Sequence, residues 1–388
     1  MKSKYLPFLL ILFTVSGFQK VISQTASIEN VEANPGEAVL VPIDFAGMTN
    51  LGAITLFVHF DTTVLTYTGI TNLCPEGNGT ISYFDPENSR VGFSWIAPGM
   101  SGVDFPDGKY LDMMFQFHGG YTELIFPEDC EFATFEGTIL QTDYINGSVS
   151  APSVTFNIKV FLEGAYEPGS GGEMSTVLNA EGLLPGIQPF APALPYFGNN
   201  EPVWLYNGDE SVAIAPADAV DWILVELRDA PTAQEATSST IVARKPCFLL
   251  KDGSVVDLNG NTPVIFYASF NQGAFVVIWH RNHLGIMSSN AVPGLGGTYV
   301  YDFTTGADKI AGGDAGYKEL ETGIWGMAAG DINADKSTDI DDKATGWSAE
   351  AGVYGYYGSD INLDGQTDNP DKNEILISNF GKQSGVPD

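Results

Sequence analysis

Two acidic segments near the carboxyl end carry the residues whose types and spacing are best suited to chemistry. The first runs from Asp331 to Lys343 and the second from Asp360 to Lys372. Aligned, both read D-I-N-x-D-x-x-T-D-x-x-D-K, and the second begins 29 residues after the first, because 360 − 331 = 29. A solvated acidic tail would not repeat one pattern twice. The repeat therefore indicates side-chain oxygens that are placed for a common purpose.

Calcium chemistry accounts for this spacing. Ca²⁺ is a hard cation that takes about six to eight oxygen ligands, and a twelve-residue loop supplies them from positions 1, 3, 5, 7, 9 and 12. The carboxylates of one short loop repel each other until a cation is bound, so we expect binding and folding to be coupled. Mg²⁺ fits less well because it keeps more water. The sequence predicts two Ca²⁺ sites, in which position 7 offers its carbonyl, with the ligands Asp331, Asn333, Asp335, Ser337, Asp339, Asp342, Asp360, Asn362, Asp364, Gln366, Asp368 and Asp371.

The paired loops resemble a dockerin module of type I over about residues 331–383. Asp instead of Glu at position 12 is a dockerin-like feature, and Ile375 to Ile377 with Phe380 offer the apolar face of a short helix. The first loop departs from the pattern with Lys336 at position 6, where a glycine normally makes the turn. Thrombospondin-type calcium repeats are a competing interpretation, although they usually run to more copies.

The elements that must position these loops are predicted to be strands. The chain has 388 residues, with 44 Gly, 22 Pro, 24 Phe and 16 Tyr, a composition that favours short strands and turns over long helices. The formal net charge of −31 argues against nucleic acid and anionic membranes as partners, because both need a basic surface. We expect a mostly β fold, with a β-sandwich over residues 25–152, a second β-rich domain over 160–328 and a small α-helical calcium-loop module over 329–384.

The order of the strands in the first of these domains resembles a cohesin. A strand at 36–43 is followed by one at 51–61, then by 64–67 and 108–117, and the closing strand carries 146–149. The resemblance covers about 125 residues and implies a sandwich that docks a calcium module. The second domain looks like an uncharacterised region of secreted Bacteroidetes-type proteins, a likeness that implies no activity.

The amino-terminal segment predicts export. Lys2 and Lys4 precede a mostly apolar stretch from Leu6 to Phe18, which is too short to span a bilayer and suits a signal peptide over residues 1–23. We place cleavage near Ser23 and Gln24 and expect a secreted protein without membrane insertion. In that compartment Cys74 and Cys130 could pair, or all three cysteines could remain small buried side chains.

Weaker candidates lie outside the loops. The pair His280 and His283 could hold a metal or serve acid–base chemistry, but a structural turn with hydrogen-bonded histidines is favoured. Carboxylates could signal a glycosidase and aromatic side chains could stack on sugars, although such groups arise by chance in an acidic chain and aromatics are more often core. The carboxylates are Asp218, Asp221, Glu226 and Asp229, and the aromatics are Trp204, Tyr206, Tyr354, Tyr356 and Tyr357.

Together these patterns predict a secreted, non-catalytic modular protein with calcium-dependent protein–protein docking. The resemblances imply dockerin- or cohesin-bearing partners, including a second copy bound head to tail, and a role in assembling extracellular complexes on polysaccharide. The alternative is a carbohydrate-binding or adhesive surface protein with a calcium-stabilised tail. An enzyme within residues 160–328 is a third hypothesis.

Overall fold

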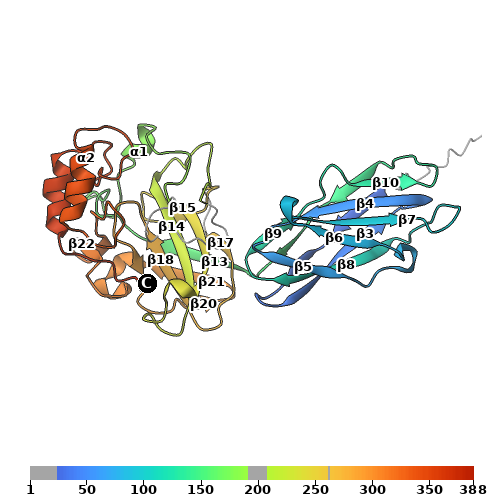
Figure 1. Cartoon of the computed structure of the whole chain (residues 1–388). Coiled ribbons are helices and arrows are strands. Elements are labelled where there is room, and N and C mark those ends of the chain that lie inside the picture. The colour runs from blue at the N-terminus through green and yellow to red at the C-terminus, as the bar shows by residue number, and fades with distance from the viewer. Residues whose placement is uncertain (1–23, 191–207, 261–262) are drawn as a thin grey trace, which may run out of the picture.

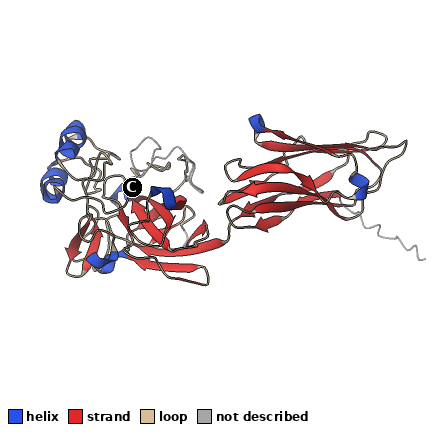
Figure 2. Cartoon of the chain, turned by 60° about the horizontal axis from the view of Figure 1, so that its bottom comes forward, coloured by secondary structure: helices blue, strands red, loops and turns tan. Residues whose placement is uncertain are grey.

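A computed structural model describes residues 24–190, 208–260 and 263–388. They form two β-rich units lying end to end, with helical segments at the end of the second unit far from the first (Figure 1). The prediction of a mostly β fold is confirmed, because strands dominate and the helices are short (Figure 2). No described helix is long and apolar enough to cross a membrane. The predicted signal peptide, residues 1–23, lies outside the described residues.

The first unit is the predicted β-sandwich. One sheet has the strand order β11-β1-β3-β8-β5, the other has the order β10-β4-β7-β6, and a small third sheet has the order β2-β12-β9. The bounds are Gln24–Ile28 (β1), Asn30–Glu32 (β2), Ala38–Ala46 (β3), Leu51–His59 (β4), Leu65–Thr71 (β5), Ile81–Asp85 (β6), Arg90–Ile96 (β7), Gly108–Phe117 (β8), Tyr121–Leu124 (β9), Glu131–Thr134 (β10), Thr142–Ile145 (β11) and Gly147–Ser150 (β12), with short helices at Pro75–Gly77 (η1) and Pro86–Asn88 (η2).

Alternating side chains hold the sandwich together. Val41 on β3 and Leu56 on β4 are fully buried, while the residues beside them in each strand face outward. Successive side chains of a strand point to opposite faces, so this alternation gives each sheet one apolar face to bury against the other. Phe45 on β3 and Phe132 on β10 join the two sheets, with ring centroids 5.1 Å apart.

The second unit is built around β14, whose residues are all buried except Asp229. It lies between β15 and β18 in a sheet ordered β16-β15-β14-β18-β19, and a second sheet is ordered β17-β13-β21-β20. The segment 153–159, between the two predicted domain ranges, forms β13 and pairs with β17 and β21. The bounds are Ser153–Lys159 (β13), Ala219–Asp229 (β14), Ile241–Leu250 (β15), Val255–Val256 (β16), Val264–Tyr267 (β17), Ala274–Trp279 (β18), Ile286–Met287 (β19), Gly294–Leu295 (β20), Thr298–Asp302 (β21), Tyr317–Glu321 (β22) and Ile324–Met327 (β23), with short helices at Val177–Ala180 (α1), Ser238–Thr240 (η3), Phe303–Thr305 (η4) and Ala307–Lys309 (η5).

The carboxyl-terminal loops are packed onto this second unit. Ala334 and Val386 are buried in one apolar cluster with Trp222 and Trp279 of the sheet, and Leu363 is buried in the main core of the unit. Each loop leads directly into helix: the first into Asp342–Trp347 (η6) and Ser348–Glu350 (α2), the second into Asp371–Leu376 (η7) and Ile377–Asn379 (η8). The loops therefore share their hydrophobic core with the sheet that precedes them.

The three cysteines are unpaired in this structure. Cys130 and Cys247 are buried and Cys74 is half-buried. The thiol of Cys130 donates to the carbonyl of Phe57 at 3.3 Å. Burial raises the pKa of Cys130 to about 11, so this side chain behaves as a small, inert apolar group.

Candidate metal centre

The two repeated segments fold into loops with the same internal hydrogen bonds. At position 1, the carboxylate of Asp331 accepts the backbone N–H groups of Asp335 and Lys336, at 3.0 and 3.2 Å. Asp360 accepts the equivalent two bonds from positions 5 and 6 of its own loop, each at 3.1 Å. Both residues are fully buried: Asp331 and Asp360 are each 0 % exposed. The buried carboxylate at position 1 thus fixes the backbone at positions 5 and 6 of each loop.

Position 12 closes each loop in the same way. Asp342 accepts the backbone N–H groups of Ile332, Asn333 and Asp339, at 2.7, 3.2 and 2.8 Å. Asp371 accepts the equivalent three bonds in the second loop, at 2.8, 3.0 and 2.7 Å. Because each of these aspartates is also the first residue of a helix, the helix start fixes the position of the carboxylate.

Positions 3, 5 and 7 repeat as well. The side-chain amides of Asn333 and Asn362 donate to the aspartate at position 5 of their own loops, each at 2.9 Å. The other oxygen of that aspartate accepts the N–H of Ser337 or of Gln366, also at 2.9 Å. Asp335 and Asp364 therefore link positions 3 and 7 of their own loops.

Position 9 distinguishes the two loops. The carboxylate of Asp339 accepts the N–H of Asp341 at 2.7 Å. One carboxylate oxygen of Asp368 is buried and has no hydrogen-bond partner. The indole of Trp347 donates to the main-chain carbonyl of Asp368 at 2.8 Å, which holds this residue in place. An oriented, buried and unpartnered oxygen fits a bound cation, because such a group otherwise loses its hydration without compensation.

The charge balance of the loops also fits a divalent cation. Burial raises the pKa of Asp342 to about 6 and that of Asp360 to about 7, and it raises the pKa of Asp368 and Asp371 as well. A buried carboxylate holds its proton more tightly because the charged form has lost water. A dication at this place would favour the charged form of these carboxylates.

The carboxylates alone do not form a finished ion site. Among the described residues, no three His, Cys, Asp or Glu side chains converge closely enough to hold a metal. The predicted ligand set is wider, since it includes the amide oxygen of Asn333 or Asn362 and a main-chain carbonyl. In this structure the carboxylates at positions 1 and 12 are directed to backbone N–H groups of their own loop.

Each loop pairs with a separate short segment. The first pairs with residues that follow η8, through Thr338 N–H to the carbonyl of Lys382 at 2.9 Å and Ser384 N–H to the carbonyl of Lys336 at 2.9 Å. The second pairs with residues that precede it, through Gly352 N–H to the carbonyl of Thr367 at 2.7 Å. Residues 381–384 thus hold the first loop, and residues 352–355 hold the second.

The His280–His283 segment is structural, as the sequence favoured. The N–H of Gly164 donates to Nε2 of His283 at 3.2 Å, so the proton of that ring is on Nδ1 and faces Nδ1 of His280 at 3.0 Å. His280 then donates from Nε2 to Asp221 at 3.2 Å. Burial lowers the pKa of both rings, so both are neutral and every ring nitrogen is engaged. No lone pair is left to bind a metal.

The carboxylates considered for glycoside chemistry hold the fold together. Glu226 is fully buried between Arg228, at 2.7 Å, and Arg244. Asp229 accepts three backbone N–H groups from residues 271–273, at 3.0, 2.8 and 3.0 Å. Asp218 is an exposed partner of Lys251 at 3.6 Å. These side chains do not form a pair facing a common open site.

The candidate aromatic side chains are dispersed. Trp204 and Tyr206 lie outside the described residues. The hydroxyl of Tyr356 donates to Asp221 at 2.6 Å, and its ring lies 4.1 Å from the guanidinium of Arg281, so it is part of the interior. Tyr354 and Tyr357 are exposed beside the second loop.

The sandwich presents an apolar surface that the sequence analysis did not identify. We call it the sheet face: the exposed side chains of Ile81, Tyr83, Ile96 and Ile139, outward from the sheet β10-β4-β7-β6. Ile81 and Ile96 are 66 % and 77 % exposed. Strand alternation was the available signal, because Phe93 and Trp95 are buried and their neighbours on β7 must point the other way.

Comparison with known proteins finds structural likeness only. No protein family model matches the chain, and no curated protein matches it. Cohesin structures cover one third of it. The sixth cohesin of scaffoldin B from Acetivibrio cellulolyticus, solved with a dockerin mutant, is 21% identical, covers 33% of this chain and 97% of its own, and has a TM-score of 0.30. A non-cellulosomal cohesin from Archaeoglobus fulgidus is 19% identical, covers 33% and 89%, and has a TM-score of 0.29.

Proposed function

We propose that this chain is a secreted, non-catalytic modular protein in which two carboxyl-terminal loops each bind one Ca²⁺ and make protein docking calcium-dependent. The observation that carries the proposal is the repeated geometry of the two loops. They share the same hydrogen bonds around buried aspartates at positions 1 and 12. The same arrangement of buried carboxylates, oriented by backbone N–H groups, occurs twice, which supports a common ligand.

The calcium ligands in the proposal are those that the spacing predicts. In the first loop they are the side chains at positions 1, 3, 5, 9 and 12 with the carbonyl of Ser337, and in the second the equivalent side chains with the carbonyl of Gln366. A bound Ca²⁺ contributes positive charge and oxygen coordination. The protein contributes the buried carboxylates at positions 1 and 12, already oriented by backbone N–H groups.

Docking is proposed between the sandwich of one chain and the calcium module of another protein. The dockerin-like loops and the cohesin-like strand order are both present on this chain, and the sheet face offers an apolar surface of the kind that protein interfaces bury. The proposal includes head-to-tail association of copies, a heterologous contact that need not close. The proposal also includes a role for this chain in assembling extracellular complexes on polysaccharide.

Calorimetric titration of residues 24–388 with Ca²⁺ tests the metal sites. We expect two sites in the unmodified chain and one intact site in Asp331→Ala and in Asp360→Ala. Asp341→Ala is the matched control, because Asp341 has the same charge but lies at position 11, outside the ligand set. Two intact sites in either ligand variant, or no binding by the unmodified chain, would refute the ligand assignment.

A carbohydrate-binding or adhesive protein is the second candidate, favoured by the exposed rings of Tyr354 and Tyr357. Glycan-array binding separates the two. Glycan binding that persists in the Asp331→Ala, Asp360→Ala double variant and is lost in Tyr354→Ala would support this candidate over calcium-dependent docking.

A further inference from the structure

Each loop is held by a buried asparagine that lies outside it. The side-chain amide of Asn282 donates to the carbonyls of Gly358 and Asp360, at 2.9 and 2.8 Å. The side-chain amide of Asn379 donates to the carbonyl of Ala329 at 2.8 Å. Gly358 and Ala329 each lie two residues before position 1 of a loop, so the two asparagines hold equivalent points of the repeat. Both are 0 % exposed.

The two asparagines come from unrelated parts of the chain. Asn282 lies in the segment that follows β18, whereas Asn379 is the last residue of η8. Asn379 also donates to Glu163 at 2.6 Å. The side chain that holds the first loop therefore comes from the helix after the second loop, and the side chain that holds the second loop comes from the segment after β18. The main-chain carbonyl of Asn282 also accepts the N–H of Gly330, just before the first loop, at 2.8 Å, so only the side-chain contacts separate the two loops. The repeat of the loops does not extend to the chain segments that hold them.

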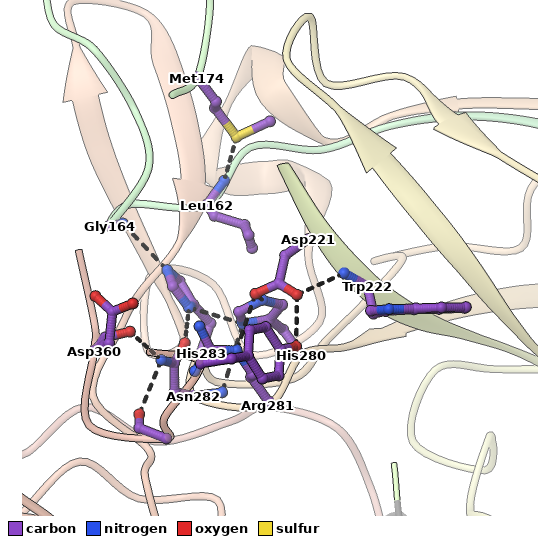
Figure 3. A network of polar contacts seen from close by, with 12 residues as sticks. Leu162, Gly164, Met174, Asp221, Trp222, His280, Arg281, Asn282, His283 and Asp360 are labelled. Atoms are coloured by element: carbon purple, nitrogen blue, oxygen red, sulfur yellow. Dashed lines mark hydrogen bonds and ion pairs between the residues drawn. The ribbon is translucent and has the colours of Figure 1, made fainter. Parts of the chain in front are cut away.

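The segment that carries Asn282 is itself fixed by buried polar contacts (Figure 3). The guanidinium of Arg281 donates to Asp221 on β14 at 2.9 Å and to the carbonyl of Tyr357. The amide oxygen of Asn282 faces Nδ1 of His283 at 2.8 Å, which fixes the orientation of the amide group. With the oxygen directed to His283, the NH₂ group of Asn282 must face the second loop.

Close packing leaves this arrangement little freedom. A Cβ placed on Gly164 would lie 1.8 Å from the carbonyl oxygen of Ile361, at position 2 of the second loop. The second loop thus packs closely against the backbone at Gly164 and is hydrogen-bonded to Asn282. Outer groups of this kind set the orientation of the atoms that bind a metal.

We propose that Asn282 and Asn379 are positioning residues, with Asn282 setting the Ca²⁺ affinity of the second loop and Asn379 that of the first. This inference rests on the proposed function, because it assumes that both loops bind Ca²⁺. Under this proposal the His280–His283 segment connects β14 to the second loop and places the side-chain amide of Asn282 against that loop.

Single-site backgrounds allow a direct test. In full-length Asp331→Ala only the second site remains, and in Asp360→Ala only the first. Asn282→Ala is expected to weaken Ca²⁺ binding about 10- to 100-fold in the first background and to leave the second background unchanged, while Asn379→Ala does the reverse. Each variant is the control for the other. Equal effects on both sites, or none, would overturn the proposal, whereas a parent chain that binds no Ca²⁺ refutes the proposed function itself.

A second measurement needs neither asparagine variant to fold. Coupling is reciprocal, so Ca²⁺ in the second loop must stabilise the hydrogen bonds of Asn282 as much as Asn282 stabilises the ion. In Ca²⁺-saturated protein with labelled asparagine, Asp360→Ala is expected to speed hydrogen exchange of the Asn282 side-chain amide and not that of Asn379. Asp331→Ala should show the opposite selectivity. Side-chain amides that respond alike to both variants would contradict the assignment.

Discussion

Position 6 of each loop requires a left-handed backbone, and the two loops meet this requirement with different residues. Gly365 adopts φ of 88° in the second loop and Lys336 adopts 72° in the first. Position 4 repeats the pattern, with Ala334 at 58° and Leu363 at 60°. Lys336 therefore adopts the same backbone conformation as Gly365, and the first loop keeps the shape of the second. The conformation costs more in the first loop, because a residue with a side chain pays about 1–2 kcal/mol in the left-handed region.

Lys336→Gly is accordingly expected to stabilise the calcium-free chain by about 1 kcal/mol. The ion pair lost with the lysine is small, because the Asp388 side chain is 96% exposed. Lys343→Gly is the matched control: it lies within η6, where a glycine should destabilise by about 1 kcal/mol. Urea denaturation measures both, and a Lys336→Gly chain less stable than the unmodified one would contradict the strain argument.

The buried histidines predict an acid-sensitive second unit. His280 and His283 are held neutral, with pKa values below their usual 6.5, among Asp221, Arg281 and Tyr356. The unfolded chain binds more protons below pH 6.5, so stability is present above that pH and is lost as the pH falls, by up to about 1.4 kcal/mol per pH unit for each histidine.

Replacing His283 isolates this effect from the titration of the loop carboxylates. We expect the urea midpoint of His283→Gln to change less between pH 7 and pH 5 than that of the unmodified chain, because glutamine can still accept the N–H of Gly164 without titrating. Parallel pH profiles for the two proteins would show that His283 is not held neutral in the folded state.

The sequence could predict the loop residues because their spacing is local. The predicted positions 1, 5 and 12 do form the repeated hydrogen-bond pattern, as Asp331, Asp335 and Asp342 show. The sequence could not predict that Asn282 supports the second loop, because the hydrogen bonds from Asn282 to that loop join residues 76 or more positions apart. Nothing in an H-x-N-H segment indicates which distant carbonyl its amide will reach.

At the scale of elements, short-range patterns again predicted most. The predicted strand 108–117 coincides with β8, the predicted strand 51–61 matches β4 to within two residues, and the predicted strand 36–43 overlaps β3. The helix after the second loop differs in detail. Leu376 is buried as expected, but Ile377 is exposed within η8, and Phe380, just after the end of that helix, is exposed as well.

Removal of residues 329–388 is expected to unfold the second unit while the sandwich stays folded. Val386 and Ala334 fill the cluster around Trp222 and Trp279, and Leu363 fills the main core, so truncation opens cavities at several places. Thermal unfolding of the truncated chain should retain only the transition of the sandwich, which has a core of its own. An unchanged second transition would show that the carboxyl-terminal segment is independent of the sheet.

For the whole molecule, charge and apolar surface act in opposite directions. A net charge of −31 keeps copies apart, whereas the sheet face favours association. Calcium bound in both loops would reduce the repulsion around the module. Self-association is therefore expected to depend on Ca²⁺.

Light scattering with Ca²⁺ and with chelator tests the proposed docking surface. We expect the unmodified chain to associate with Ca²⁺, and Ile96→Asp to abolish this association by placing a charge on the sheet face. Leu40→Asp is the matched control, because Leu40 is an exposed aliphatic residue on β3 of the opposite sheet. A monomer under all conditions removes self-assembly, and equal effects of both variants would remove the sheet face from the proposal.

The central claim is that both acidic loops bind calcium and become ordered by it. Hydrogen–deuterium exchange of residues 331–342 and 360–371, with saturating Ca²⁺ and after exhaustive chelation, measures this directly. The account predicts slower exchange in both loops when Ca²⁺ is present, with little change in β3 and β4 of the sandwich. Identical exchange in the two conditions, together with no calcium in elemental analysis of the purified protein, would contradict it.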